Sequence, residues 1–177
     1  MILIFSLFFY AWGAMDFVGI LLVASIANFF IVRYMHMATE HRRRYLLSSV
    51  ALNLGLLLYF KYANFFVGNF NAALHSMGIT EVGWTKVALP IGISFYTFQT
   101  ITYAVDVYRK ENEPLRKLTD YLLYILSFPQ MIAGPIVRYG TVAKDITSRK
   151  EVIDDKLLGF YRFSIGLAKK VLIANYL

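Results

Sequence analysis

The sequence predicts an all-α integral membrane protein that crosses the bilayer several times. Of its 177 residues, 58% are hydrophobic and 16% are charged, and the mean hydropathy is +0.54. A soluble domain carries about 25% charged residues. The charges are also clustered between long uncharged runs, more apolar segments than one small soluble core can bury. We expect a single membrane domain over residues 1–177, with about five to six hydrophobic helices including one broken or re-entrant element.

The first three hydrophobic segments are bounded by charges. Ile2–Trp12 is too short to cross about 30 Å of hydrocarbon without tilt, whereas Phe17–Val32 lies between Asp16 and Arg33 and is predicted to span. Tyr45–Phe60 is predicted as the next span. The stretch 63–85 is rich in Asn and Gly, which favours an interfacial helix followed by a loop.

The later segments differ in regularity. Val87–Val107 is a predicted helix with Pro90 in its first turn, where a missing amide donor costs little. Tyr121–Val137 contains two prolines and a glycine, so Ser127–Tyr139 is predicted to be broken or re-entrant, inside protein or beside water. A hydrophilic stretch, 140–156, precedes an apolar helix over Leu157–Leu177. Both ends of the chain lie within apolar runs, which favours the amino-terminal portion of a larger protein.

The charge distribution predicts a topology. The net charge of +7 arises from basic residues beside hydrophobic runs, a pattern that sets membrane orientation and argues against nucleic-acid binding. The basic clusters 33–44 and 109–117 are separated by two crossings and are both expected in the cytoplasm. The intervening 61–86 is expected outside, and 138–150 is cytoplasmic if the re-entrant element turns back.

Candidate functional residues lie on one face of the fourth segment. Gly92, Tyr96, Gln99, Tyr103 and Asp106 follow helical spacing, and such polar side chains must face protein or a water-filled path. Two interpretations stay open, namely the lining of a substrate tunnel and hydrogen bonding between helices. Asp106 can also pair with Arg109 or Lys110.

Further candidate residues lie outside this helix. Gln130 and Arg138 flank the Pro/Gly breaks. Two interpretations stay open there: backbone groups freed by the breaks contact a ligand, or the breaks are a structural kink whose backbone groups bond to neighbouring helices. His36 and His41 lack the HExxH spacing of a zinc site and are expected to be solvated, and His75 is expected at the surface. The chain has no cysteine. Neither a metal nor a bound cofactor is expected, and no complete catalytic machinery is apparent.

Four blocks, LNLGLLLYFKYANFF (52–66), LPIGISFYTFQTITYAVDVYRK (89–110), SFPQMIAGPIVRY (127–139) and GLAKKVLIANYL (166–177), resemble the membrane-bound O-acyltransferase family. The similarity is to its alginate O-acetyltransferase branch, relatives of the teichoic acid D-alanyl transfer protein. It implies a multi-helix fold with a central tunnel in the bacterial inner membrane. Such proteins pass an acyl group from a cytoplasmic donor, for example acetyl-CoA, towards polysaccharide hydroxyls, commonly with a periplasmic acetyltransferase partner.

In that family the essential histidine lies on a later helix, beyond the block matching 166–177. No histidine of this chain inherits that role, so the resemblance implies no catalytic residue and an inactive isolated chain. The alternatives are a small transporter or channel subunit and a non-catalytic scaffold that binds a partner. The resemblance implies candidates for the tunnel wall only, namely Tyr96, Gln99, Tyr103, Asp106, Tyr108, Arg109, Gln130 and Arg138.

Overall fold

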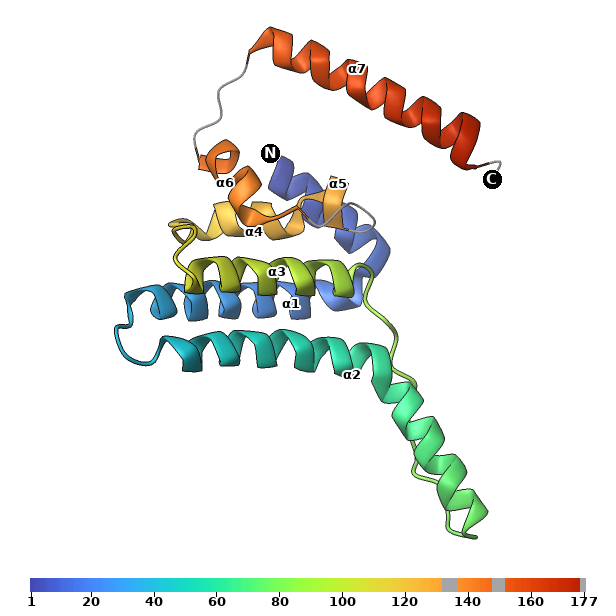
Figure 1. Ribbon diagram of the computed structural model, residues 1–177. Helices are drawn as coiled ribbons and strands as arrows, with labels where there is room; N and C mark the ends of the chain where they lie inside the picture. The colour runs from blue at the N-terminus through green and yellow to red at the C-terminus, as the bar shows by residue number, and fades with distance from the viewer. Residues whose placement is uncertain (132–136, 148–151, 176–177) are drawn as a thin grey trace. The chain divides into compact units, whose positions relative to one another are not determined.

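The computed structural model describes residues 1–131, 137–147 and 152–175, and the regular elements within these ranges are helices. The chain forms two compact units, residues 1–143 and 144–177. Within the first unit, helices α1, α2, α3 and α4 pack against one another (Figure 1). The all-helical fold class is confirmed over the described residues.

Two described helices are long and apolar enough to cross a membrane. These are α1 (Ile2–Met37) and α2 (Arg42–Ser76), of 36 and 35 residues. About 20 helical residues span the hydrocarbon core, so both exceed it. Helix α3 (Ile93–Tyr108) has 16 residues and α4 (Leu118–Leu126) has nine. The expected five to six hydrophobic helices therefore stay a prediction.

The predicted segments 2–12 and 17–32 lie within α1, on either side of a kink. Its helical geometry is interrupted only at Ala14, where φ is −154° and ψ is 50°. Ending a helix leaves four donors and four acceptors without intrahelical partners, which is costly in an apolar environment. A one-residue kink changes the direction of the chain at much lower cost.

The expected break at Lys61 is wrong, since α2 continues through it to Ser76, and the helix predicted after residue 63 is the last part of α2. The expected loop begins only at Met77 and runs back beside the last part of α2 (Figure 1). Asn64 Nδ2 donates to the Val87 carbonyl (2.7 Å) and Asn64 Oδ1 accepts from the Val87 amide (2.9 Å). Asn71 forms the same pair of bonds with Val82. The asparagines thus fasten the connection to a continuous helix.

Helix α3 begins later than expected, and Pro90 lies in the preceding turn instead of the first helical turn. The Ile93 amide donates to the Pro90 carbonyl at 3.3 Å. Gly92 has a φ of +75°, which a side chain would strain. A Cβ at Gly92 would lie 2.6 Å from the carbonyl oxygen of Met131. Glycine therefore permits both the turn and the close approach of α5 (Phe128–Met131).

The break predicted in the fifth segment occurs at Ser127, between α4 and α5. Gly134 and Pro135 lie outside the described residues. Helix α6 (Tyr139–Thr147) follows, so the predicted hydrophilic stretch is partly helical. In the second unit, α7 (Ile153–Lys169) starts four residues before the predicted Leu157 and ends in a π-helical turn, Lys170–Ala174. No α7 side chain is buried within the described structure.

Polar side chains join the two long helices in their interior. Asn28 Oδ1 of α1 accepts hydrogen bonds from Ser49 Oγ (2.7 Å) and Asn53 Nδ2 (2.8 Å) of α2. All three side chains are buried. Asn28 Nδ2 donates to the Ala24 carbonyl, so the amide is satisfied at both ends. Such bonds between apolar helices fix their register.

Candidate functional site: a buried tyrosine cluster and a basic pocket

Four buried tyrosines gather where α3, α4 and α6 meet. The ring centroid of Tyr103 lies 4.7 Å from that of Tyr139 and 5.1 Å from that of Tyr121. Tyr124 and Tyr139 are 5.5 Å apart. These spacings fall in the range of favourable aromatic pairs. The cluster joins segments that are separate in sequence into one packed layer.

The phenol hydroxyls of this cluster bind backbone groups. Tyr103 Oη accepts from the Leu115 amide at 3.0 Å, and Tyr139 Oη donates to the Glu113 carbonyl at 2.8 Å. Burial raises the pKa of Tyr139 to about 12, so its hydroxyl stays protonated and available as a donor. Tyr124 Oη donates to the Val137 carbonyl at 3.0 Å. The tyrosines therefore hold the connection after α3 and the chain that enters α6.

Part of the predicted polar face of α3 is buried against other helices. Tyr96, Gln99 and Tyr103 are buried. Gln99 Nε2 donates to the Tyr124 carbonyl at 2.8 Å, a hydrogen bond between α3 and α4. For Gln99 and Tyr103 the described contacts are therefore interhelical. The lining of a tunnel by residues of this face stays a prediction.

The remaining candidates lie elsewhere. Asp106 is partly exposed, and Arg109 approaches Glu111 at 3.8 Å, with both of these side chains exposed. Arg138 is exposed. The backbone of Gln130 belongs to α5, but its side chain lies outside the described structure. Asp106 nevertheless lies close enough to Arg138, Arg109 and Tyr124 for electrostatic interaction, so these exposed candidates lie at the edge of the tyrosine cluster.

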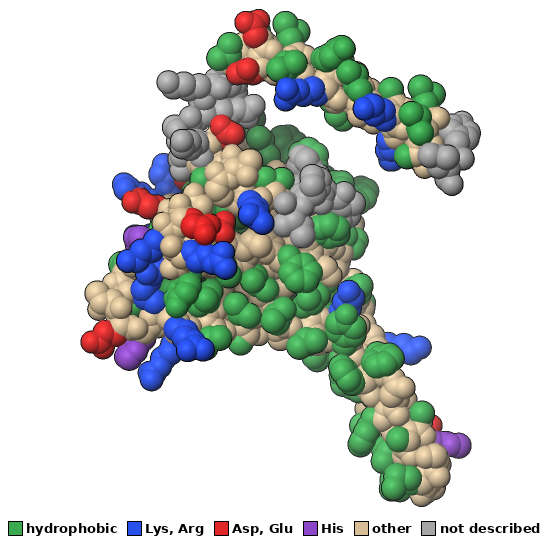
Figure 2. Space-filling model, in the orientation of Figure 1, with side chains coloured by type: hydrophobic (Ala, Val, Ile, Leu, Met, Phe, Trp, Pro, Cys, Tyr) green, Lys and Arg blue, Asp and Glu red, His purple; other side chains and the backbone are tan. Residues whose placement is uncertain are grey.

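The basic clusters 33–44 and 109–117 meet at one end of the helices. Arg33 Nη1 donates to the Arg116 carbonyl at 3.2 Å. Arg42 Nη2 donates to the carbonyls of Val107 (3.2 Å) and Tyr108 (3.0 Å) at the end of α3. Figure 2 shows Lys and Arg side chains gathered at this end. The two clusters therefore lie at the same end of the helices, and the side of the membrane that this end faces stays a prediction.

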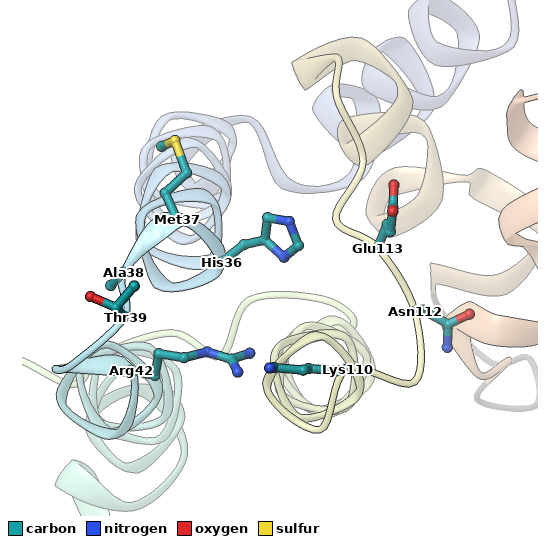
Figure 3. A pocket seen from close by; sticks show the side chains of 8 residues that line it. All are labelled: His36, Met37, Ala38, Thr39, Arg42, Lys110, Asn112 and Glu113. Atoms are coloured by element: carbon teal, nitrogen blue, oxygen red, sulfur yellow. The ribbon is translucent and has the colours of Figure 1, made fainter.

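A pocket of about 550 Å³ lies between these segments. His36 comes from the end of α1, Arg42 from the start of α2, and Lys110 from the end of α3 (Figure 3). Asn112 and Glu113 close it from the connection to α4. An adjoining hollow of about 370 Å³ shares His36 and Glu113 and adds Arg33 and Arg116. The sequence pattern predicts that His36 is solvated and that the basic residues orient the chain in the membrane. The predicted common side of the two basic clusters was the available indication of a site.

A third pocket, of about 330 Å³, lies between α2 and its following connection. The Trp84 indole donates to Asn64 Oδ1 at 2.9 Å. The amide groups of Asn64 and Asn71 that line it are already bonded to the connection. The polar side chains that line this pocket therefore attach the connection to α2.

The chain aligns over most or all of its length with curated O-acetylases and O-acetyltransferases. It is 41% identical over its full length to a probable alginate O-acetylase AlgI of Pseudomonas syringae. The resemblance to the alginate O-acetyltransferase branch of the membrane-bound O-acyltransferases is confirmed by these relatives. A peptidoglycan O-acetyltransferase of Helicobacter pylori is 33% identical over 96% of the chain. A teichoic acid D-alanyltransferase of Bacillus subtilis is 37% identical over 47% of it.

The chain spans about a third of the length of the curated relatives it matches, 35% for the Pseudomonas syringae protein and 37% for the Helicobacter pylori one. No family model matches the chain. No solved structure matches it either. The similarity to this acyltransferase branch therefore rests on the curated relatives.

Proposed function

We propose that the chain forms a membrane portion of an O-acyltransferase that passes acetyl or acyl groups towards hydroxyls of an extracytoplasmic polysaccharide. The full-length similarity to an alginate O-acetylase carries this proposal. The relatives named for peptidoglycan and teichoic acid support a reaction class in which the acceptor varies. The donor is a cytoplasmic acyl carrier such as acetyl-CoA.

The protein resides in the bacterial inner membrane and crosses it several times. The end bearing residues 33–44 and 109–117 faces the cytoplasm, because positive charge favours that side. The connection after α2 then faces the periplasm. A periplasmic acetyltransferase partner completes transfer to the glycan.

The α3 face forms part of the protein wall beside the acyl path. Within that wall, Gln99 and Tyr103 hold α4 and the connection at residue 115, through the hydrogen bonds described above. They act as positioning residues. Tyr96, Asp106, Tyr108, Arg109, Gln130 and Arg138 stay candidates for contact with the acyl donor or acceptor.

The 177-residue chain alone is not expected to transfer acetyl groups. Transfer to a hydroxyl requires a general base, most often histidine. His36, His41 and His75 are all exposed. His36 and His41 lie at the basic end, and His75 lies near the end of α2. None is placed against the buried α3 face that we assign to the acyl path.

The test expresses the whole gene product in an alginate-producing bacterium whose own O-acetylase gene is deleted. We expect acetyl esters to return to the polysaccharide, measured by NMR of the purified polymer, whereas the 177-residue chain restores none. An unchanged acetyl content with the whole, membrane-inserted product would contradict the proposal. Solute flux in donor-free proteoliposomes would favour the transporter alternative, and partner capture without either activity would favour the scaffold.

A further inference from the structure

The basic pocket lies where two apolar helices end. Helix α1 ends at Met37 and α2 begins at Arg42, and both are candidates for membrane spans. Charged residues at such ends lie at the depth of the lipid headgroups. Apolar side chains stay exposed on the same helices nearby, including Phe30 and Leu47. A ligand in this pocket can therefore extend apolar chains along the helices.

Arg42 is held in place with unused donor capacity. Its guanidinium bonds the last carbonyls of α3 and lies 5.5 Å from the ring centroid of Tyr108. Its Nε is buried and has no hydrogen-bond partner among the described residues. A buried N–H without an acceptor is unfavourable. An oxygen-rich anion in the pocket would supply that acceptor.

Lys110, which also lines the pocket, has an unusual backbone conformation. Its φ is +63°, the left-handed conformation that favours glycine. The Lys110 amide donates to Val107 and the Glu111 amide to Asp106, an arrangement that closes α3 and normally places glycine at this position. A lysine here keeps backbone strain that glycine would relieve. Strained positions of this kind are a reason to look for function.

The charge around the pocket favours an anion. Arg42, Lys110 and the nearby Arg33 and Arg116 outnumber the acid Glu113 among the lining residues. Guanidinium and ammonium groups suit phosphate oxygens, the first through paired N–H donors and the second as a point charge. Basic pockets between membrane helices bind lipid headgroups by this chemistry.

We propose that this pocket binds the phosphate of an anionic phospholipid of the cytoplasmic leaflet. The Arg42 guanidinium and the Lys110 ammonium, which both line the pocket, bind the phosphate, and the acyl chains lie along the exposed apolar sides of α1 and α2. The same phosphate chemistry occurs in soluble nucleotides, but the position between two apolar helix ends favours a lipid. This site does not depend on the proposed acyl transfer.

The test uses the purified whole protein in nanodiscs of phosphatidylglycerol or phosphatidylcholine, followed by detergent release and mass spectrometry of the retained lipid. We expect preferential retention of phosphatidylglycerol. Lys110→Gly should reduce that retention at least five-fold while the thermal unfolding midpoint, measured in neutral detergent without lipid, does not fall. Arg43→Ala removes an exposed neighbouring charge that does not line the pocket, and should retain phosphatidylglycerol like the wild type.

Three results would overturn the lipid site. The first is equal retention of both lipids, and the second is an equal loss in Lys110→Gly and Arg43→Ala, which would show a diffuse surface charge effect. The third comes from adding ADP to protein in neutral detergent. A thermal shift with ADP that Lys110→Gly abolishes, together with no preference for phosphatidylglycerol, would assign the pocket to a soluble phosphate compound.

Discussion

The Oδ1 of Asn28 lies 2.7 Å from the hydroxyl of Ser49, inside the contact between the two longest helices. Asn53 donates to the same oxygen, so one acceptor in α1 holds two donors of α2. Lipid tails are as apolar as the helix surfaces, so burial alone gives little preference for one register. The amide therefore specifies how α1 and α2 pair.

Removing this network should loosen the helix pair. Ser49→Ala is expected to lower the free energy of unfolding by about 0.6–1.7 kcal/mol, the range for hydrogen bonds between membrane helices. Asn28→Leu should cost more, because both donors lose their acceptor. Thermal unfolding in detergent measures both changes. The neighbouring Ser48 is exposed, and its hydrogen bond within the described residues is to the Arg44 carbonyl of its own helix, so Ser48→Ala should be neutral. Equal effects at positions 48 and 49 would contradict this prediction.

Gly92 should tolerate no side chain. Gly92→Ala imposes a left-handed conformation on alanine, which costs about 1–3 kcal/mol, and brings a Cβ to 2.6 Å from a backbone oxygen. The expected result is a lower unfolding midpoint. Gly55, within α2, has open space around its position and a helical conformation, so Gly55→Ala should be neutral or stabilising by up to about 1 kcal/mol. A stable Gly92→Ala protein would disprove the assigned turn.

Gln99 offers a test of the two interpretations of the α3 face. Gln99→Met preserves side-chain length but leaves the Tyr124 carbonyl without this donor, at a cost of about 1–3 kcal/mol. We expect a reduced folded fraction and acetyl transfer within two-fold of wild type per folded molecule of the whole gene product. Size-exclusion profiles and polymer acetyl content measure the two quantities. Loss of transfer at unchanged stability would instead place Gln99 in the substrate path.

The connection after α2 should depend on Asn64. This side chain bonds both backbone groups of Val87 and the Trp84 indole, so Asn64→Ala removes three hydrogen bonds at once. We expect faster cleavage between residues 77 and 92 in limited proteolysis. Within the part of the chain that the structure describes, the Asn69 side chain bonds to the Phe65 carbonyl of its own helix, and Asn69→Ala should be cleaved at the wild-type rate. Identical digestion of both variants would contradict the fastening role.

The topology can be tested directly because the chain has no cysteine. Thr39→Cys and Asn112→Cys should react with a membrane-impermeant maleimide only after the inner membrane is opened. Met77→Cys, at the opposite end of α2, should react in intact spheroplasts. Labelling of Thr39→Cys and Met77→Cys from the same side would refute the assigned orientation.

Several features were predictable because they depend on local pattern. Hydrophobic runs and charge clusters indicated a helical membrane protein, and the interruption between residues 12 and 17 coincides with the kink at Ala14. The common side of the two basic clusters followed from counting crossings, and the arginine contacts agree with it. The resemblance to the acyltransferase branch followed from the motifs at 89–110 and 127–139.

Helix ends were harder to predict. A polar texture after Lys61 resembles the end of a helix, yet α2 continues because its asparagines bond to a returning segment whose position the local pattern does not contain. Pro90 is compatible with a first helical turn, but the left-handed Gly92 moves the start of α3 to Ile93.

The amino-acid sequence alone therefore determined the helical membrane class, the placement of charge at helix ends and the acyltransferase branch, since composition, periodicity and similarity are properties of the chain read in order. Only the tertiary structure decided which polar groups meet. Arg33 reaches a carbonyl 83 residues away, and Arg42, His36 and Lys110 converge on one pocket from three helices. Such convergence depends on how helices pack, and packing is set by contacts between segments that no local pattern records.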